Sequence, residues 1–378
     1  MMGMIGRAAL IVVGFGAMFS STALAGEKVI IKDITGRDVA VSVPVENVIL
    51  GEGRQIYFVA ALDRDAPFKR VVGWRDDLSK ADPESYAAYL AKYPDIAKLP
   101  TFGGMKDGTF DIEQAVSLKP DVIIMNLDAK TSTEESGYIE KLGKVGIPLV
   151  YIDFREKPME NTEASMRIMG KLLGEETKAE DFIKFRADSI AKVTNVLAKT
   201  DLVRPVVFIE RAGGFSDDCC MSFGNENFGK MVEIAGGTNM AKDIIPGTFG
   251  AVNPEQIIAS NPDQIIITGG NWQGYVPGGN WVGVGYGADL KQAHRKLVNL
   301  TKRPAFTGVK AVKDGNVHAI WHQFYNNPYQ FVAIQEIAKW LHPELFKNLD
   351  PEATFKELHA RFLPLDYMPG YFVSLSGE

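Results

Sequence analysis

The chain has 378 residues, of which 46% are hydrophobic, 23% charged and 10% aromatic. These ordinary proportions disfavour a disordered chain, a collagen-like repeat and a protein that crosses the membrane many times. At roughly 150 residues per domain, the length fits two domains or one large one. The 47 Asp and Glu residues outnumber the 41 Lys and Arg residues, and the formal charge of −6 argues against a nucleic-acid partner.

Residues 1–25 have the pattern of a secretory signal peptide. Arg7 is followed by an apolar run and then by Ala23-Leu24-Ala25, which fits cleavage after Ala25. The run of about 12 residues is shorter than the roughly 20 that span a bilayer; an uncleaved N-terminal anchor is the alternative. No cysteine lies near the cleavage point, which disfavours a bacterial lipoprotein. We therefore expect an exported protein that is free in a Gram-negative periplasm.

The first elements after the leader predict a hairpin and the opening of an α/β lobe. Alternating apolar runs on both sides of Thr35-Gly36-Arg37 predict the hairpin. Short strands are predicted at 48–50 and 71–73, and a short helix at 56–62. Three tyrosines recur at roughly helical spacing in the next segment: Tyr86, Tyr89 and Tyr93.

An internal repeat indicates the domain organisation. DIEQAVSLKPDVIIMN at 111–126 and NPEQIIASNPDQIIIT at 253–268 share Glu-Gln, Pro-Asp and Ile-Ile pairs at an offset of 142. Each unit predicts a short helix, a proline turn and a fully apolar strand, as in a parallel sheet with helices on its faces. The offset exceeds the roughly 20–50-residue periods of solenoids, so we expect two similar α/β lobes. A chance likeness between two common helix–strand units is the alternative.

A long helical stretch lies between the repeats, from about Met159 to Lys199, with an interruption at Gly174. Thr177 and Glu180 fit a capping box at a helix start. Apolar residues at 183, 187, 190, 193 and 197 recur at steps of three and four and predict one buried face. A helix over 177–199 would measure about 34 Å, at roughly 1.5 Å per residue, which is enough to connect two lobes.

These features resemble the class III periplasmic substrate-binding proteins of iron-siderophore, haem and cobalamin ABC importers. The resemblance implies two Rossmann-like lobes joined by a single long helix, with the ligand in the cleft between them. We expect an N-terminal lobe at 26–155, a helical connector at 156–203 and a C-terminal lobe at 204–378. The stretches that carry the resemblance are the hairpin turn (35–37), IEQAVSLKPDVII (112–124), GIPLVYID (146–153), AGGTNMA (235–241), AVNPEQIIASNPDQIII (251–267) and RPAFTGVKAVKDGNVHAIWHQFYNNP (303–328).

The resemblance implies a non-enzymatic protein that delivers a bound ligand to an ABC permease dimer with ATPase subunits. We expect the ligand to be a ferric siderophore or related iron chelate. We expect a monomer. Binding of haem, cobalamin or an oxyanion such as molybdate is the alternative; an exported α/β enzyme is a remote one, because the sequence has no G-x-S-x-G, H-E-x-x-H or P-loop motif. The family's permease-docking glutamates map to Glu113 and Glu255, one in each repeat. Two solvated carboxylates at helix starts are the alternative reading.

Ligands of such sheets bind outside the carboxyl ends of the strands. Five predicted strand ends lead into loops with arginines or aromatic residues, which we expect to meet in one cleft. Arginines can pair with anionic oxygens, and aromatic rings offer flat surfaces, which favours a bulky, planar, anionic ligand. Surface ion pairs and core positions are the alternatives. The expected ligand-binding residues are Arg54, Gln55, Trp74, Arg75, Arg211, Trp272, Tyr275, Trp281, Tyr286, His322 and Tyr325.

Cys219 and Cys220 are the only cysteines. Export favours oxidation, yet adjacent Cα atoms lie about 3.8 Å apart across a trans peptide bond, below the roughly 4.4–6.8 Å of ordinary disulfides. A vicinal disulfide and two reduced, buried thiols are both open. The five histidines all lie in the C-terminal third, so the two lobes cannot share a histidine site. We expect no directly bound metal and no cofactor.

Overall fold

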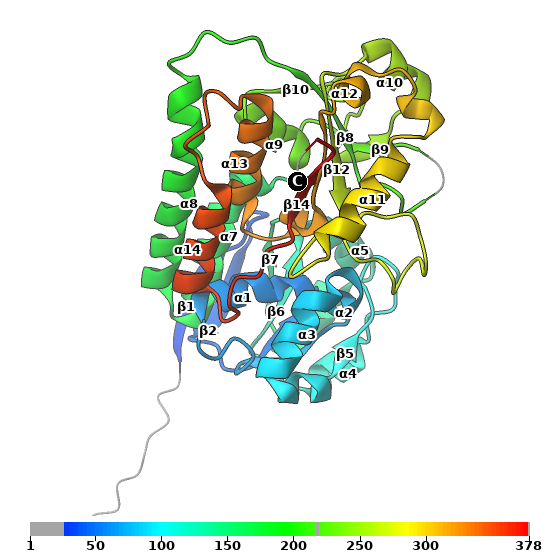
Figure 1. Cartoon of the computed structure of the whole chain (residues 1–378). Helices are drawn as coiled ribbons and strands as arrows, with labels where there is room; N and C mark the ends of the chain where they lie inside the picture. The colour runs from blue at the N-terminus through cyan, green and yellow to red at the C-terminus, as the bar shows by residue number, and fades with distance from the viewer. Residues whose placement is uncertain (1–25, 217–218, 377–378) are drawn as a thin grey trace, which may run out of the picture.

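The computed structural model describes residues 26–216 and 219–376, so the predicted signal peptide at 1–25 lies outside the described residues. Figure 1 shows two lobes, one above the other, with helices α7 (Pro158–Leu173) and α8 (Glu176–Leu197) along one side of the molecule. Within the described part of the chain, no helix is both long and apolar enough to cross a membrane.

A five-stranded parallel sheet forms the centre of the N-terminal lobe, in the order β5-β4-β3-β6-β7. Helices cover both faces, so the central strands are buried and apolar throughout. The strands are β3 (Val48–Leu50), β4 (Val71–Arg75), β5 (Thr101–Phe102), β6 (Val122–Asn126) and β7 (Leu149–Ile152). The helices are α1 (Ile56–Leu62), α2 (Asp77–Ala81), α3 (Pro83–Lys92), α4 (Ile112–Ser117), α5 (Lys130–Glu135) and α6 (Tyr138–Lys144).

The C-terminal lobe has a second five-stranded sheet, in the order β10-β8-β12-β13-β14, parallel except at its last strand. The strands are β8 (Val206–Glu210), β10 (Thr238–Asn239), β12 (Gln264–Gly269), β13 (Val317–Trp321) and β14 (Phe372–Ser374), beside the small pair β9 (Met221–Phe223) and β11 (Phe249–Ala251). The helices are α9 (Phe228–Ile234), α10 (Pro254–Ser260), α11 (Leu290–Leu300), α12 (Lys310–Lys313), α13 (Gln330–Leu341) and α14 (Pro351–Phe362). The predicted fold class is confirmed.

The repeated sequence builds the same unit in both lobes. Helix α4 leads into β6 and helix α10 leads into β12, as the sequence predicted. The aspartate of the repeated Pro-Asp pair has the same structural role in both lobes. Asp121 accepts hydrogen bonds from the backbone N–H of Asn47, next to β3, at 2.8 Å, and Asp263 accepts one from the N–H of Val206, at the start of β8, at 2.9 Å. Each aspartate therefore joins its strand to the neighbouring strand at the amino end of the sheet.

The helical connector differs in detail from its prediction. The stretch is interrupted at Gly174, as expected, and Gly174 has a left-handed φ of 69°. Helix α8 begins at Glu176, so Thr177 lies inside its first turn and the predicted capping box is wrong. Of the predicted apolar face, Ala187 is exposed. The buried face of α8 includes Ile183 and Val193 from that prediction. Its buried residues are Ala179, Phe182, Ile183, Phe185, Arg186, Ser189 and Val193.

One hydrophobic core extends through both lobes, and two smaller ones are confined to the N-terminal and C-terminal lobes. In the shared core, Tyr57 of α1 contacts Trp321 edge-on, with ring centroids 6.2 Å apart. The hydroxyl of Tyr329 donates to the backbone oxygen of Tyr57 at 3.1 Å. Arg64 also donates to the backbone oxygen of Leu363, from the segment after α14. The lobe limits 26–155 and 204–378 stay our proposal, since the C-terminal segment returns to the N-terminal lobe.

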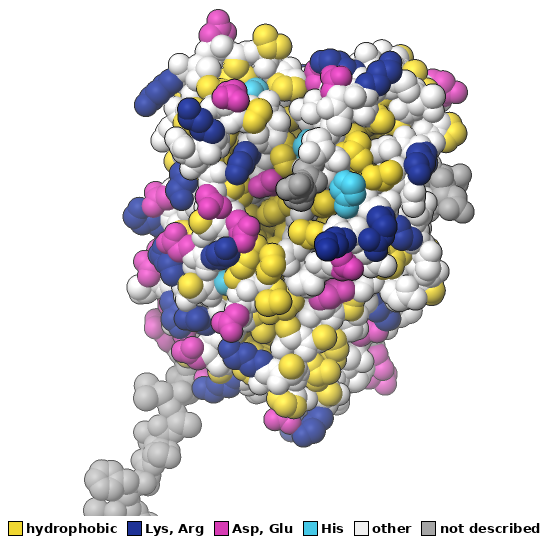
Figure 2. Space-filling view, viewed as in Figure 1, with side chains coloured by type: hydrophobic (Ala, Val, Ile, Leu, Met, Phe, Trp, Pro, Cys, Tyr) yellow, Lys and Arg dark blue, Asp and Glu magenta, His cyan; other side chains and the backbone are white. Residues whose placement is uncertain are grey.

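The surface carries both signs of charge. Figure 2 shows Lys and Arg side chains interspersed with Asp and Glu side chains over the visible face. Many form helical pairs, such as Lys184 with Asp188 and Arg361 with Glu357, at four-residue spacing. Such exposed pairs each contribute only about 0.3–0.5 kcal/mol. The stability of the fold therefore comes from its cores.

The opening hairpin, β1 (Glu27–Lys32) and β2 (Asp38–Val43), is tied to the N-terminal lobe through its turn. The carboxylate of Asp33 accepts hydrogen bonds from the N–H and hydroxyl groups of Thr35 and from the backbone and guanidinium of Arg37. Arg37 in turn donates to the backbone oxygen of Leu149 at 2.7 Å. Burial would raise the pKa of Asp33, but the bonds from Thr35 and Arg37 outweigh it and lower the pKa.

Replacing Asp33 with alanine is expected to lower the free energy of unfolding by about 2–4 kcal/mol, because it leaves several partly buried donors unpaired. Since the folded-state pKa of Asp33 is lowered, this contribution is present above about pH 4 and is lost as the pH falls through the folded-state pKa. Urea unfolding at pH 7 measures the effect. Asp38→Ala is the control, because Asp38 is exposed and its one ion pair among the described residues is with the exposed Lys32. Equal losses in the two variants would contradict the assignment.

Candidate ligand-binding cleft

A cavity of about 450 Å³ lies between the lobes. Its walls come from the carboxyl ends of both sheets: Arg54 follows β3, Arg75 ends β4, Arg211 follows β8 and His322 follows β13. The loops that follow these strands therefore meet at one cavity, as the sequence predicted. The lining residues are Arg54, Arg75, Asp77, Ala81, Lys106, Asp107, Arg155, Arg211, Ala212, Phe215, Trp272, Tyr275, His322, Gln323 and Tyr325.

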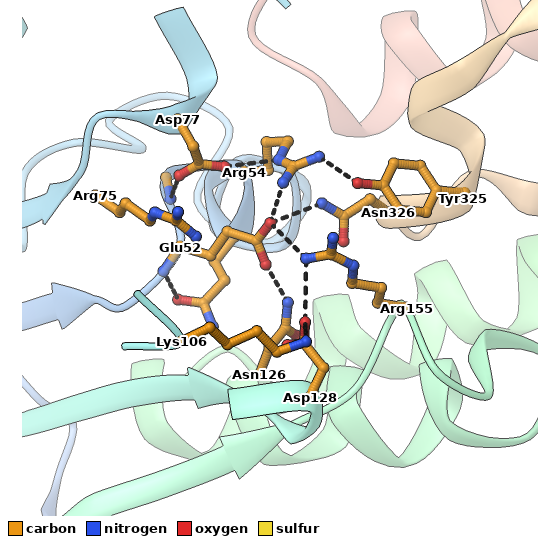
Figure 3. A network of polar contacts seen from close by, with 12 residues as sticks. Glu52, Arg54, Arg75, Asp77, Lys106, Asn126, Asp128, Arg155, Tyr325 and Asn326 are labelled. Carbon is orange, nitrogen blue, oxygen red and sulfur yellow. Dashed lines mark hydrogen bonds and ion pairs between the residues drawn. The ribbon is translucent and has the colours of Figure 1, made fainter. Parts of the chain in front are cut away.

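A buried carboxylate, that of Glu52, organises the cationic side of the cavity. Figure 3 shows it among two arginines and two asparagines. Arg54 and Asn126 donate to its two oxygens, and Asn326 of the C-terminal lobe donates at 2.9 Å. Arg155 lies 3.5 Å from the same carboxylate. Glu52 therefore binds groups from both lobes.

The arginines that surround Glu52 are held by further partners. Arg54 donates to Asp77 at 2.6 Å and to the hydroxyl of Tyr325, across the cleft, at 2.8 Å. Arg155 pairs with Asp128 at 3.1 Å. These bonds fix each guanidinium in one orientation, so the donors at the cavity are preorganised.

Two other cations that line the cavity pair with carboxylates through more exposed side chains. Lys106 lies 2.8 Å from Asp128, and Arg75 lies 3.5 Å from Asp107. Gly104 permits the second pair, because a Cβ at this position would lie 2.6 Å from a guanidinium nitrogen of Arg75 and 2.0 Å from an Asp107 oxygen. The loop that follows β5 is therefore shaped around the Arg75 side chain.

Arg211 is different from the other cations. Among the described residues, its guanidinium has no hydrogen-bond acceptor and no ion-pair partner, and its Nε is buried. It lies over the ring of Phe249, 4.7 Å from the centroid. Burial, with smaller contributions from Arg155 and Arg54, lowers the pKa of Arg211. The guanidinium is half-buried at the cavity wall and unpaired, so it is available to pair with an anion.

An aromatic wall faces the arginines. Trp272 meets Phe215 edge-on at 5.4 Å and His322 at 5.5 Å. His322 also bonds Thr268 through Nδ1 at 2.8 Å, which leaves Nε2 available to a ligand. Burial and the nearby arginines, Arg211 foremost, hold the pKa of His322 well below its usual range, so the imidazole is neutral. The lining of the cavity therefore combines cations with flat aromatic rings.

The lobes are also bonded to each other around the cavity. Asn271 donates to Glu84 at 2.6 Å, and Thr248 donates to Glu156, the first residue of the proposed connector, at 2.8 Å. Gln323 lies between the lobes and donates to the backbone oxygen of Ala81 at 2.7 Å. The relative position of the two walls is thus set by specific polar contacts.

Seven of the predicted ligand-binding residues line this cavity: Arg54, Arg75, Arg211, Trp272, Tyr275, His322 and Tyr325. The structure does not bring the other four to it. Gln55 is buried behind Glu52, where its Oε1 accepts from the Glu52 backbone N–H at 3.3 Å. Trp74 packs against Phe68 in the lobe interior, because neighbouring residues of a strand point to opposite faces and Arg75 takes the cavity side.

The remaining two lie in the glycine-rich loop after β12. Trp281 donates through Nε1 to the backbone oxygen of Val276 at 3.0 Å, so its ring stabilises the loop itself. Tyr286 lines a separate small cavity beside Trp321 and Tyr371. Aromatic residues in this loop thus divide between the cleft and the protein interior.

The sequence interpretation did not include several lining residues, of which Arg155 and Lys106 are charged and bonded to the network. Arg155 follows β7, so the strand-end rule applied to the other loops would have found it. Lys106 follows the two-residue strand β5, which has no clear sequence pattern. Asp77, Asp107 and Phe215 were also missed.

Cys219 and Cys220 are joined by a disulfide across a cis peptide bond, with Cα atoms 3.1 Å apart. Their sulfur atoms and a carboxylate oxygen of Glu210 lie within 4.8 Å of one another, close enough to hold a metal ion. Those atoms are already engaged, since Arg303 donates to both oxygens of Glu210. This cluster therefore gives no reason to revise the expectation that no metal binds directly.

Glu113 and Glu255 occupy equivalent positions in the two lobes. Each is in the first turn of its helix, α4 or α10, two residues after a capping residue, Asp111 or Asn253. Both are exposed. In Figure 1 these helices lie at the lower and upper ends of the side away from α8. Their carboxylates have no ion pair with any residue that the structure describes.

Comparison with known proteins gives the class. Residues 76–322 match the periplasmic binding protein family. The TroA-like periplasmic binding protein FepB from Veillonella parvula is 30% identical, with a TM-score of 0.83 over 92% of this chain and 100% of that one. The molybdate-binding protein MolA of Haemophilus influenzae is 23% identical over 90% of this chain and 92% of its own. The cobalamin-binding protein of Halobacterium salinarum is 23% identical over 49% of this chain. This match covers 46% of that relative, so the chain spans about half of its length.

The chain belongs to the periplasmic binding protein family. It is the solute-binding component of an ABC importer, a non-enzymatic and extracytoplasmic protein whose partners are the permease and ATPase subunits of that importer.

Proposed function

We propose that the cleft captures an anionic iron chelate of the siderophore class for delivery to the permease. The observation that carries this proposal is the pairing of Arg211, which lacks an anionic partner among the described residues, with the aromatic wall of Trp272, Tyr275 and Phe215 in one cavity. Charge-assisted hydrogen bonds from a guanidinium suit carboxylate, catecholate or hydroxamate oxygens. Flat rings suit the bulky body of such a chelate.

Tryptophan fluorescence tests the proposal, because Trp272 lines the cavity. Ferric catecholate, hydroxamate and carboxylate chelates are titrated into the protein, with haem, cobalamin and molybdate in parallel. At least one ferric chelate is expected to quench the emission with a Kd of about 1 μM or lower, corresponding to about 8 kcal/mol of binding free energy. Trp272→Phe should remove most of the signal, and Trp340→Phe, outside the cavity, should keep it. Binding only of haem, cobalamin, molybdate or a bare metal ion would overturn the iron-chelate assignment.

A small oxyanion is the second candidate. The likeness to the molybdate-binding MolA extends over nearly the whole of both chains, and one unpaired guanidinium would suit a tetrahedral oxyanion. The aromatic wall and the cavity volume of about 450 Å³ favour the larger ligand. The molybdate arm of the titration decides between them.

We also propose that Glu113 and Glu255 contact the permease and that the protein acts as a monomer after cleavage behind Ala25. The equivalent, exposed positions of the two glutamates support the docking role, because two matched carboxylates can meet two matched cations on a permease dimer. N-terminal sequencing of the exported protein and its mass in solution test the other two points.

A further inference from the structure

We infer that Glu52 acts as a buried counter-anion that determines which ligand charge the cleft prefers. With Glu52 ionised, the cleft is matched to an anion with a single net negative charge. The inference rests on the proposed function, since it assigns a charge to the anion proposed above. It names Glu52 as a positioning residue that acts through Arg54 and Arg155.

The charges around the cavity nearly cancel. Five cationic side chains line it, and four of them are paired with carboxylates. Arg54 pairs with Glu52 and Asp77, and Arg155 with Glu52 and Asp128. The remaining pairs join Lys106 to Asp128 and Arg75 to Asp107. Five cations against four carboxylates leave one positive charge, which is that of Arg211.

The ionisation of Glu52 follows from its surroundings. Burial would raise its pKa, but the charges of Arg54 and Arg155 outweigh burial and lower the pKa to about 2. Glu52 therefore keeps its negative charge throughout the neutral range. Because Glu52 and Arg54 are buried, their charges are poorly screened by salt, and one charge more or less strongly affects an anion in the adjoining cavity.

Glu52 lies behind its arginines rather than in the cavity wall. A ligand meets the outward-facing donors of Arg54 and Arg155, whose charge Glu52 has already balanced. An anion with two or three charges would bring excess negative charge into this site, whereas a single charge matches Arg211. Glutamine at this position keeps the shape and one oxygen acceptor and removes the charge, so Glu52→Gln isolates the electrostatic role.

The experiment compares pairs of probes that differ in charge. Fe(III)–EDTA and Fe(III)–DTPA carry one and two negative charges, and perrhenate and molybdate are tetrahedral oxyanions with one and two. Calorimetry measures the Kd of each for the wild-type protein, Glu52→Gln and Asn126→Ala. The asparagine variant is the matched control, since it removes a hydrogen bond to Glu52 and leaves the charge.

The wild-type protein is expected to bind the monoanion of a pair at least as tightly as the dianion. Glu52→Gln should shift this preference toward the dianion by about tenfold or more, and Asn126→Ala should leave it unchanged. An unchanged preference in Glu52→Gln, or an equal loss for both charges, would overturn the inference. If the oxyanions bind and no ferric chelate does, the iron-chelate function fails and the oxyanion pair still tests the charge. Binding of none of the four probes overturns the charge inference, and the fluorescence titration then decides the iron-chelate function separately.

Discussion

Replacing Glu113 and Glu255 together with alanine is expected to reduce uptake through the permease by about a hundredfold or more, with ligand affinity unchanged. Each carboxylate is exposed, at the start of equivalent helices in the two lobes, and neither lies at the cleft. Charged pairs of this kind orient a docking partner, and loss of a well-placed pair costs about 2–5 kcal/mol. Either single variant should have an intermediate effect, because the other lobe still docks.

The measurement is uptake into vesicles that contain the permease, using the chelate that binds most tightly in the fluorescence titration. Glu352→Ala is a matched control. Glu352 is likewise exposed in the first turn of a helix, α14, after a capping aspartate, but it belongs to the helices beside α8. A loss of ligand affinity in the double variant, or equal uptake by the double variant and the control, would show that the glutamates do not dock the permease.

Replacing Arg211 with alanine is expected to weaken ligand binding by about a hundredfold or more, since its guanidinium is the cation that the described residues leave unpaired. Arg211→Lys should recover part of the affinity, because it keeps the charge and loses the two-pronged geometry. The same alanine variant should unfold at an equal or slightly higher urea concentration, because it removes a half-buried charge that has no partner among the described residues. An affinity loss caused by collapse of the fold would lower the unfolding midpoint instead.

Arg75→Gln is the comparison for Arg211. Arg75 lines the same cavity and is already paired with Asp107 at 3.5 Å. We therefore expect a loss of roughly tenfold or less. Titration of both variants with the same chelate gives the ranking, and a larger effect at Arg75 than at Arg211 would contradict the assignment of the free charge.

The sequence predicted the architecture well because its signals are local. The fully apolar runs of β6 and β12, each after a short helix and a Pro-Asp turn, are enough to predict parallel strands in two lobes. Parallel strands bring their carboxyl ends to one edge, so Arg54, Arg211 and His322 could be assigned to one cleft before any contact was known.

The site was harder to predict where a residue's role depends on which face of a strand it occupies, or on partners that are distant in the sequence. Trp74 and Arg75 are adjacent, and only the exact pleat of β4 decides which of them faces the cavity. The role of Glu52 requires Asn126, Arg155 and Asn326, which lie up to 274 residues away in the chain. No spacing rule connects such residues. The glycine-rich loop of Trp281 and Tyr286 has no periodicity from which a direction could be inferred.

The core that extends through both lobes has a consequence for how the molecule comes apart. Tyr57 and Tyr329 join the lobes by a ring contact and a hydrogen bond. Separating the lobes would therefore expose apolar surface of both to water. The repeat shows two related halves, but neither half has a complete interior of its own. We therefore expect the two halves to unfold as one cooperative unit. A polypeptide that ends between them is expected to expose the apolar inner face of a lobe rather than to form a smaller stable protein.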